Sequence, residues 1–128
     1  LIYRNVDFNT YGFLNATEDF ITNHPDLAQA VVDAYEQARE WALENPDETA
    51  ALLAEVAGID LGVATTVIQE RSNLDVSGIP GEDQIAVLEK IAPVLVESGD
   101  VQGGQASVDK ALSSIVNATF AEKAVGGE

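Results

Sequence analysis

The sequence contains no cysteine and only one histidine, His24. Without cysteine the chain has no disulfide, no thiolate metal ligand and no thiol nucleophile. A lone histidine that precedes Pro25, where a helix begins, is more typical of a helix boundary than of a metal ligand or a catalytic base. The segment 78–81 contains two glycines but is not followed by Lys-Ser or Lys-Thr, so it lacks the pattern of a phosphate-binding loop. The sequence therefore predicts no catalytic residue, no metal site and no cofactor.

Long hydrophobic runs are also missing. No stretch of about 18 apolar residues occurs, so no membrane-spanning helix is predicted. The first residues, Leu1 to Asn5, lack the charged, apolar and small-residue regions of a signal peptide. Because the chain also begins without methionine, we expect it to be a segment of a longer protein, in which case the missing signal says nothing about its compartment.

Basic residues are scarce. The chain has 6 Lys and Arg against 22 Asp and Glu, which gives a formal net charge of −16. Such a chain is repelled by the phosphates of nucleic acid and by anionic membrane surfaces, so we predict no nucleic-acid partner. A well-solvated surface is the simplest explanation of the charge, and the alternatives are a cation-binding role or adaptation to high salt.

Two consecutive helices are predicted between His24 and Gly58. Pro25 suits the first helical position, and Asp26 places a negative charge beside the positive end of the helix dipole. Asn45 can cap the second helix, and Gly58 stands where a left-handed C-cap residue is expected. The apolar residues of the first helix recur at three- and four-residue spacing and form one stripe: Leu27, Val31, Ala34, Tyr35, Ala38, Trp41 and Ala42.

Four more helical segments are predicted from caps and spacing. They are a short helix that begins at Thr17, a helix over 61–71 capped by Asp60, a helix over 82–98 and a helix over 107–122. The loop over 72–81 contains two glycines and one proline. Pro93 lies inside the helix over 82–98 and should kink or break it, because proline lacks the N–H of an internal hydrogen bond.

The first 16 residues have a different character from the rest, since aromatic and β-branched residues are concentrated there. This composition favours one strand over 2–8 and another over 11–16, with a bend at Asn9 and Thr10. We expect these strands to pair with each other or with another chain. The predicted fold class is mainly α with one or two short N-terminal strands.

Several blocks of sequence carry a resemblance to a known family. They are Tyr11-Gly12-Phe13-Leu14-Asn15-Ala16-Thr17-Glu18-Asp19-Phe20, His24-Pro25-Asp26, Trp41-Ala42, Asn45-Pro46-Asp47-Glu48-Thr49-Ala50, Leu53-Ala54 and Gly58-Ile59-Asp60. In order and spacing these blocks resemble the last third of the substrate-binding proteins of ABC importers for aliphatic sulfonates, taurine and nitrate. The resemblance is specific in the first helices and looser after Gly81, and Pro93 departs from a helix that is uninterrupted in the family.

The resemblance implies a piece of an α/β type II periplasmic binding protein, whose two lobes close on an oxyanion and deliver it to a membrane permease. It implies that 1–128 is a single unit, in which 1–16 are the strands that return across the hinge and 17–128 are the C-terminal helical part. The implied function is solute binding for an ABC importer of aliphatic sulfonates, such as taurine, or of similar small oxyanions. The implied location is periplasmic or otherwise extracytoplasmic, with or without a lipid anchor on the full-length protein.

The resemblance also implies candidates for ligand binding, although most contacts of the family come from residues outside this sequence. Asn5, Asn9, Tyr11 and Gly12 lie where the returning strand passes the cleft, and Arg71 occupies a position where related sequences tend to carry Arg. Ordinary structural roles are the favoured alternative for each residue. Tyr11 suits a core, the two asparagines suit turns, Gly12 suits close packing, and Arg71 suits the C-terminal end of a helix.

Two further functions stay open beside solute binding. One is a self-standing acidic helical module that binds another protein, and the other is an enzyme like those of thiamine-precursor synthesis, which share the fold. The lack of catalytic groups favours a protein that is not an enzyme. The resemblance implies that the helical stripes cover a sheet that this chain largely lacks, so we expect homo-oligomers or exchange of the N-terminal strands between copies. We also expect the chain to bind its small oxyanion only within the full-length protein.

Overall fold

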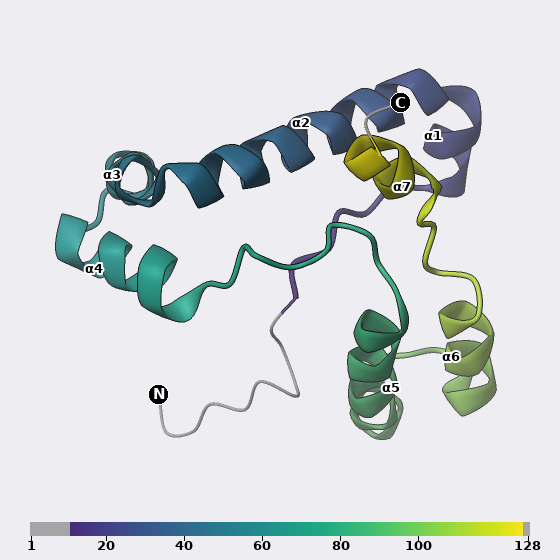
Figure 1. The fold of residues 1–128 in the computed structure, drawn as a ribbon. Coiled ribbons are helices and arrows are strands. Elements are labelled where there is room, and N and C mark those ends of the chain that lie inside the picture. The colour runs from purple at the N-terminus through teal and green to yellow at the C-terminus, as the bar shows by residue number, and fades with distance from the viewer. Residues whose placement is uncertain (1–10, 127–128) are drawn as a thin grey trace.

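The computed structural model describes residues 11–126, which form helices joined by irregular segments (Figure 1). Seven of these helices are α-helical and one, η1, is a π-helix. In chain order they are α1 (Glu18–Asn23), α2 (Pro25–Glu44), α3 (Pro46–Ala57), α4 (Leu61–Thr65), η1 (Thr66–Arg71), α5 (Glu82–Glu97), α6 (Gly104–Leu112) and α7 (Thr119–Gly126).

The ends of the first three helices confirm the predicted signals, with one difference. The Thr17 hydroxyl accepts a hydrogen bond from the backbone N–H of Phe20 and caps α1, while Gly58 ends α3 with a φ of 64°. Asn45 occupies the cap position before α3, but its side chain does not cap that helix. Its amide instead donates to the carbonyl oxygen of Trp41 at 2.8 Å and closes the end of α2.

The segment after Gly58 is helical over the predicted range but changes from an α-helix to a π-helix. Asp60 caps α4 as predicted, because its carboxylate accepts from the backbone N–H of Gly62 at 2.8 Å. The chain then continues as the π-helix η1 to Arg71, a change that no sequence pattern indicated. Within η1 the amide of Gln69 donates to the carboxylate of Asp47 at 2.7 Å and ties η1 to the first turn of α3.

Of the kink or break predicted at Pro93, the break is wrong, because α5 runs without interruption from Glu82 to Glu97, while the kink stays a prediction. Proline removes one intrahelical hydrogen bond, whereas the bonds on its C-terminal side persist. The backbone N–H of Ser98, for example, still donates to the carbonyl oxygen of Val94 at 3.0 Å. At the other end, the side chain of Gln84 accepts from the backbone N–H of Gly81 and closes the first turn.

The prediction of a single last helix over 107–122 is also wrong, because two helices, α6 and α7, occupy this region. Their separation has a local cause in the residues that follow α6. The hydroxyl of Ser113 donates to the carbonyl oxygen of Lys110 at 2.7 Å, a bond that competes with the helical ladder. The side chain of Asn117 then accepts from the backbone N–H of Thr119 and starts α7.

No strand occurs among residues 11–126, so the strand predicted over 11–16 is not formed in this structure. A strand needs a neighbouring strand for its backbone hydrogen bonds, and the described part of the chain offers none. The strand predicted over 2–8 lies outside the described residues. The larger α/β fold to which such strands would belong therefore stays a prediction.

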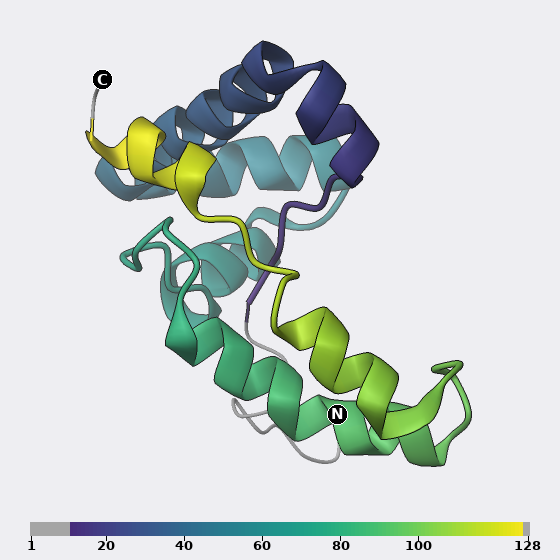
Figure 2. The same ribbon diagram turned by 90° about the vertical axis from the view of Figure 1, so that its right-hand side faces the viewer.

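The described helices pack as two separate groups, as Figures 1 and 2 show. In the first group, which we call the body, α1, α3 and α7 pack against α2, and α4 and η1 pack against α3. In the second group, which we call the hairpin, α5 and α6 lie side by side and contact no other described helix. The segments 72–81 and 113–118 connect the two groups.

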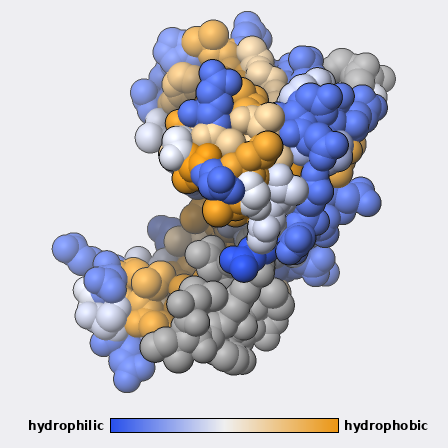
Figure 3. Space-filling model, turned by 90° about the vertical axis from the view of Figure 1, so that its left-hand side faces the viewer, coloured by the Kyte–Doolittle hydropathy of each residue, from blue (hydrophilic) through white to orange (hydrophobic). Residues whose placement is uncertain are grey.

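The core is thin in both groups. The buried apolar residues of the described chain are small: Ala28, Ala50, Ala64, Ala92 and Val108. Figure 3 shows apolar side chains at the surface among hydrophilic ones, and Val56 of α3 is 79% exposed. The helices thus present apolar faces that nothing in the described chain covers.

Candidate functional site

The described residues contain no cluster of three or more His, Cys, Asp or Glu side chains that could hold a metal ion. None of the described helices is long and apolar enough to cross a bilayer. His24 lies between α1 and α2, and its ring contacts that of Phe20 at a centroid separation of 5.6 Å. This position agrees with the interpretation of His24 as a boundary residue.

The predicted ligand-binding residues belong to separate segments of the chain. Asn5 and Asn9 lie outside the described residues. Tyr11 and Gly12 belong to the irregular segment before α1, whereas Arg71 ends η1 in the body. Two depressions on the described surface, along α5 and α6, are lined by residues of other segments. The role of these five residues in binding stays a prediction.

The surroundings of Tyr11 and Gly12 can be described in more detail. Tyr11 is half-buried, and its ring lies 6.4 Å from that of Phe13, measured between centroids. Gly12 is exposed, and a Cβ atom added to it would meet nothing within 4 Å. The alternative of close packing at Gly12 therefore finds no support in this arrangement of the chain.

A charged pair on α2 is the most constrained polar arrangement of the body. Glu36 is the buried charged residue of the described chain, with 9% of its surface exposed. The guanidinium of Arg39 donates to both carboxylate oxygens of Glu36, at 2.8 Å from Nε and 2.6 Å from Nη2. Its third donor, Nη1, reaches the carbonyl oxygen of Leu74 at 2.8 Å. We call this arrangement of Glu36, Arg39 and Leu74 the latch, because it fastens the connector 72–81 to α2.

The latch also explains the charge states of the two side chains. Hydrogen bonds from Arg39 lower the pKa of Glu36 although burial acts in the opposite direction. The same hydrogen bonds raise the pKa of Arg39, because they stabilise its protonated form. Glycine is needed nearby, because a Cβ atom on Gly78 would lie 2.8 Å from a carboxylate oxygen of Glu36. Since three donors of Arg39 are already used within the chain, the latch is a structural element and not a free anion site.

A second polar contact joins α2 to α7. The side-chain amide of Gln29 donates to the carboxylate of Asp33 at 2.8 Å and to the carbonyl oxygen of Phe120 at 2.9 Å. The oxygen of the same amide is buried without a hydrogen-bond partner. The bond to Phe120 holds α7 against α2 although the two residues are 91 positions apart in the sequence.

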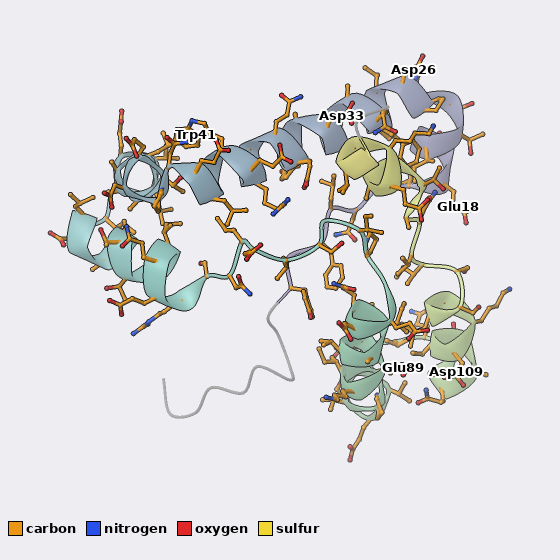
Figure 4. The ribbon with its side chains drawn as sticks, viewed as in Figure 1. Glu18, Asp26, Asp33, Trp41, Glu89 and Asp109 are labelled. Carbon is orange, nitrogen blue, oxygen red and sulfur yellow. The ribbon has the colours of Figure 1, made fainter. Side chains whose placement is uncertain are left out.

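An open groove runs along the hairpin. One depression of about 530 Å³ is lined by Gly81, Glu82, Ile85, Ala86, Glu89 and Val116. A second, of about 440 Å³, shares Ile85 and Glu89 with the first. It is lined further by Ala92 of α5 and by Gln105, Asp109 and Leu112 of α6. Glu89 and Asp109 come from the two neighbouring helices, as Figure 4 shows. We call the two depressions together the hairpin groove.

Neither the latch nor the hairpin groove was among the predicted sites. The spacing of Glu36 and Arg39, three residues apart on one helix, was a usable signal for the pair. Nothing in the sequence indicated the contact with Leu74, which is 35 residues away from Arg39. The groove depends on how α5 and α6 lie against each other, which spacing within either helix does not specify.

Comparison with protein families gives one match. Residues 3–49 match the model of the family described as NMT1/THI5 like. The matched region comprises the N-terminal segment, α1, α2 and the first residues of α3, so within the described helices it falls in the body alone. The match supports a periplasmic-binding-type family and is consistent with a substrate-binding protein of ABC transporters. Comparisons with curated proteins and with solved structures gave no significant match.

Proposed function

We propose that this chain is the C-terminal segment of the extracytoplasmic solute-binding component of an ABC importer. The observation that carries the proposal is the family match over 3–49, which overlaps the blocks of sequence from Tyr11 to Ala50 that resemble sulfonate-, taurine- and nitrate-binding proteins. The proposed ligand class is aliphatic sulfonates or similar small oxyanions. The proposed macromolecular partner is the permease of the importer.

The packing supports a segment that belongs to a larger fold. The apolar side chains of Leu27, Val31 and Tyr35 on α2 are 57%, 43% and 64% exposed, although their spacing forms one stripe. A stripe of this kind stabilises a protein only when another layer covers it. In the proposed fold that layer is a sheet made by other parts of the protein.

Two alternatives rest on other observations. The exposed apolar stripes and the charge of −16 also suit an acidic helical module that binds a partner protein. A thiamine-precursor-synthesis-like enzyme is the lesser alternative, since the matched family is described by the name NMT1/THI5 like.

The test begins with the coding region that precedes Leu1. The proposal predicts that the open reading frame continues upstream with about 150 to 200 further residues, because a two-lobed fold needs more than one domain length. The longer product should bind taurine or an alkanesulfonate with a micromolar or lower dissociation constant by isothermal titration calorimetry. Chloride serves as the control anion, since it lacks the oxygen atoms that a sulfonate site recognises.

Variants of the longer product separate the ligand-binding candidates from their structural alternatives. Arg71→Gln should weaken sulfonate binding at least about tenfold if Arg71 contacts the oxyanion. Lys110→Gln removes the same charge at an exposed position on the hairpin and should leave binding unchanged. A longer product that ignores every sulfonate, or a start codon directly before Leu1, would refute the proposal in favour of the protein-binding module. Conversion of a thiamine precursor by the longer product would instead favour the enzyme.

A further inference from the structure

We propose that the hairpin groove is a docking site for a cationic amphipathic helix of a partner protein. The proposal does not depend on the proposed transport function, because the groove lies outside the region that matches the family. The partner is defined by its chemistry, with aliphatic residues on one face of a helix and Lys or Arg along the edges of that face.

The shape of the groove fits a single helix. Its floor runs along α5 from Gly81 to Ala92, a length of about 16 Å, which corresponds to about three turns of an α-helix. The helices α5 and α6 pack side by side and contact no other described helix, which leaves such a groove between them. A third helix that lies in this groove would complete a small bundle.

The floor of the groove is apolar. Ile85 and Ala92 contribute from α5, Leu112 contributes from α6, and Val116 contributes from the segment that follows. Ile85, Leu112 and Val116 are only half-buried, so the hairpin leaves part of their surface accessible within the groove. Aliphatic side chains from an amphipathic helix would cover this surface and remove it from water.

The edge of the groove is acidic. Glu82 and Glu89 line it from α5, and Asp109 lines it from α6. All three carboxylates belong to exposed residues. The two helices of the hairpin together carry five acidic side chains and two basic ones, and the whole chain has a net charge of −16. An apolar floor with an acidic edge is complementary to aliphatic residues flanked by Lys or Arg.

A second copy of this chain fits the groove less well. Every described helix of eight residues or more has at least as many acidic as basic side chains. None of them therefore offers a cationic face, and two chains of charge −16 repel each other. Charge complementarity thus points to a different chain as the occupant.

The test uses the purified 128-residue chain and synthetic probes. A fluorescein-labelled peptide of Leu and Lys, with Leu at the spacing of one helix face, should bind with a rise in fluorescence anisotropy. A peptide with Glu in place of every Lys, and one with Ser in place of every Leu, should each bind at least about tenfold more weakly. The first comparison tests the acidic edge, and the second tests the apolar floor.

A pair of double variants with equal charge locates the site. Glu89→Lys with Asp109→Lys reverses two exposed charges at the groove and should weaken the Leu/Lys peptide about tenfold. Glu48→Lys with Glu55→Lys makes the same two reversals on α3, away from the groove, and should leave the affinity within about twofold of the parent. Each reversal adds two charges, so both variants change the net charge from −16 to −12.

Several results would overturn the proposal. Equal loss of affinity in both double variants would mean that the peptide responds to net charge and not to the groove. Failure of the Leu/Lys peptide to bind the parent chain would exclude the stated partner. Light scattering could also show that the parent chain is a dimer. If the peptide then binds only after dilution to the monomer, the groove is the site of a second copy of the chain.

Discussion

The body and the hairpin are built from the same kinds of residue but are held together differently. In the body, side-chain hydrogen bonds join segments far apart in the sequence, as when Arg39 binds Leu74, Gln29 binds Phe120 and Gln69 binds Asp47. In the hairpin, the buried seam consists of one alanine from α5 and one valine from α6. Bonds such as Gln105 to Asp109 there stay within one helix.

This difference teaches which part of the chain is held by contacts between distant segments and which part has few of them. The body has polar contacts that fix its segments in one arrangement, and it also contains the described helices that match a known family. The hairpin has a small seam and an open groove, so fewer buried contacts stabilise it. Regions with few buried apolar contacts open at lower free energy than the rest of a protein. We therefore expect the hairpin to open while the body stays folded.

The largest expected effect comes from the latch. Arg39→Met removes the partner of Glu36 and leaves a mostly buried carboxylate without its ion pair, which should lower the free energy of unfolding by about 2–4 kcal/mol. Urea denaturation followed by far-UV circular dichroism measures the change. The control Lys110→Met removes the same charge from an exposed position and should cost less than about 0.5 kcal/mol. Equal effects of the two variants would show that the latch does not hold the body.

A smaller effect is expected in the seam of the hairpin. Val108→Ala removes two buried methyl groups and should lower the local stability of α5 and α6 by about 1–2 kcal/mol. Hydrogen exchange read by mass spectrometry should then quicken in peptides from α5 and α6 but not in those from α2. The control Val56→Ala changes a side chain that is 79% exposed and should leave exchange unchanged. Faster exchange throughout the chain would mean that body and hairpin unfold together.

The smallest effect concerns pH. Because Arg39 lowers the pKa of Glu36, the folded state binds this proton less readily than the unfolded state. The stabilisation is therefore complete above the ordinary glutamate pKa of about 4.3 and is lost as the pH falls through the lower folded-state pKa. The difference in unfolding free energy between the parent and Glu36→Gln should shrink over this acidic range. If this difference in unfolding free energy stays constant from neutral to acidic pH, the ionised form of Glu36 does not stabilise the latch.

The helix ends of the body could be predicted because they are encoded locally. Thr17, Pro25 and Gly58 each act on the turn in which they stand, so the sequence around them contains the necessary information. The division between α6 and α7 was missed because apolar spacing continues across it. The signal was present in Ser113 and Asn117, whose side chains form the local bonds that separate the two helices.

The sites were harder to predict than the helices. The latch needs the carbonyl oxygen of Leu74, whose position relative to α2 follows from the path of a whole connector and not from any spacing. The hairpin groove likewise arises from the contact between α5 and α6. The ligand-binding candidates were predicted from the family resemblance. Residues of several segments that bind one ligand come together only in the complete fold. Tyr11 and Gly12 precede α1 and Arg71 ends η1, so their joint role in binding stays a prediction.

Native-state hydrogen exchange tests most directly whether the hairpin unfolds independently of the body. Amide exchange of the parent chain, followed by NMR across a series of low urea concentrations, gives an opening free energy for individual residues of α2 and of α5. We predict that the amides of α5 open at lower free energy, and with a weaker dependence on urea, than those of α2. If the amides of both helices share one opening free energy and one urea dependence, the chain is a single cooperative unit and the distinction between body and hairpin is wrong.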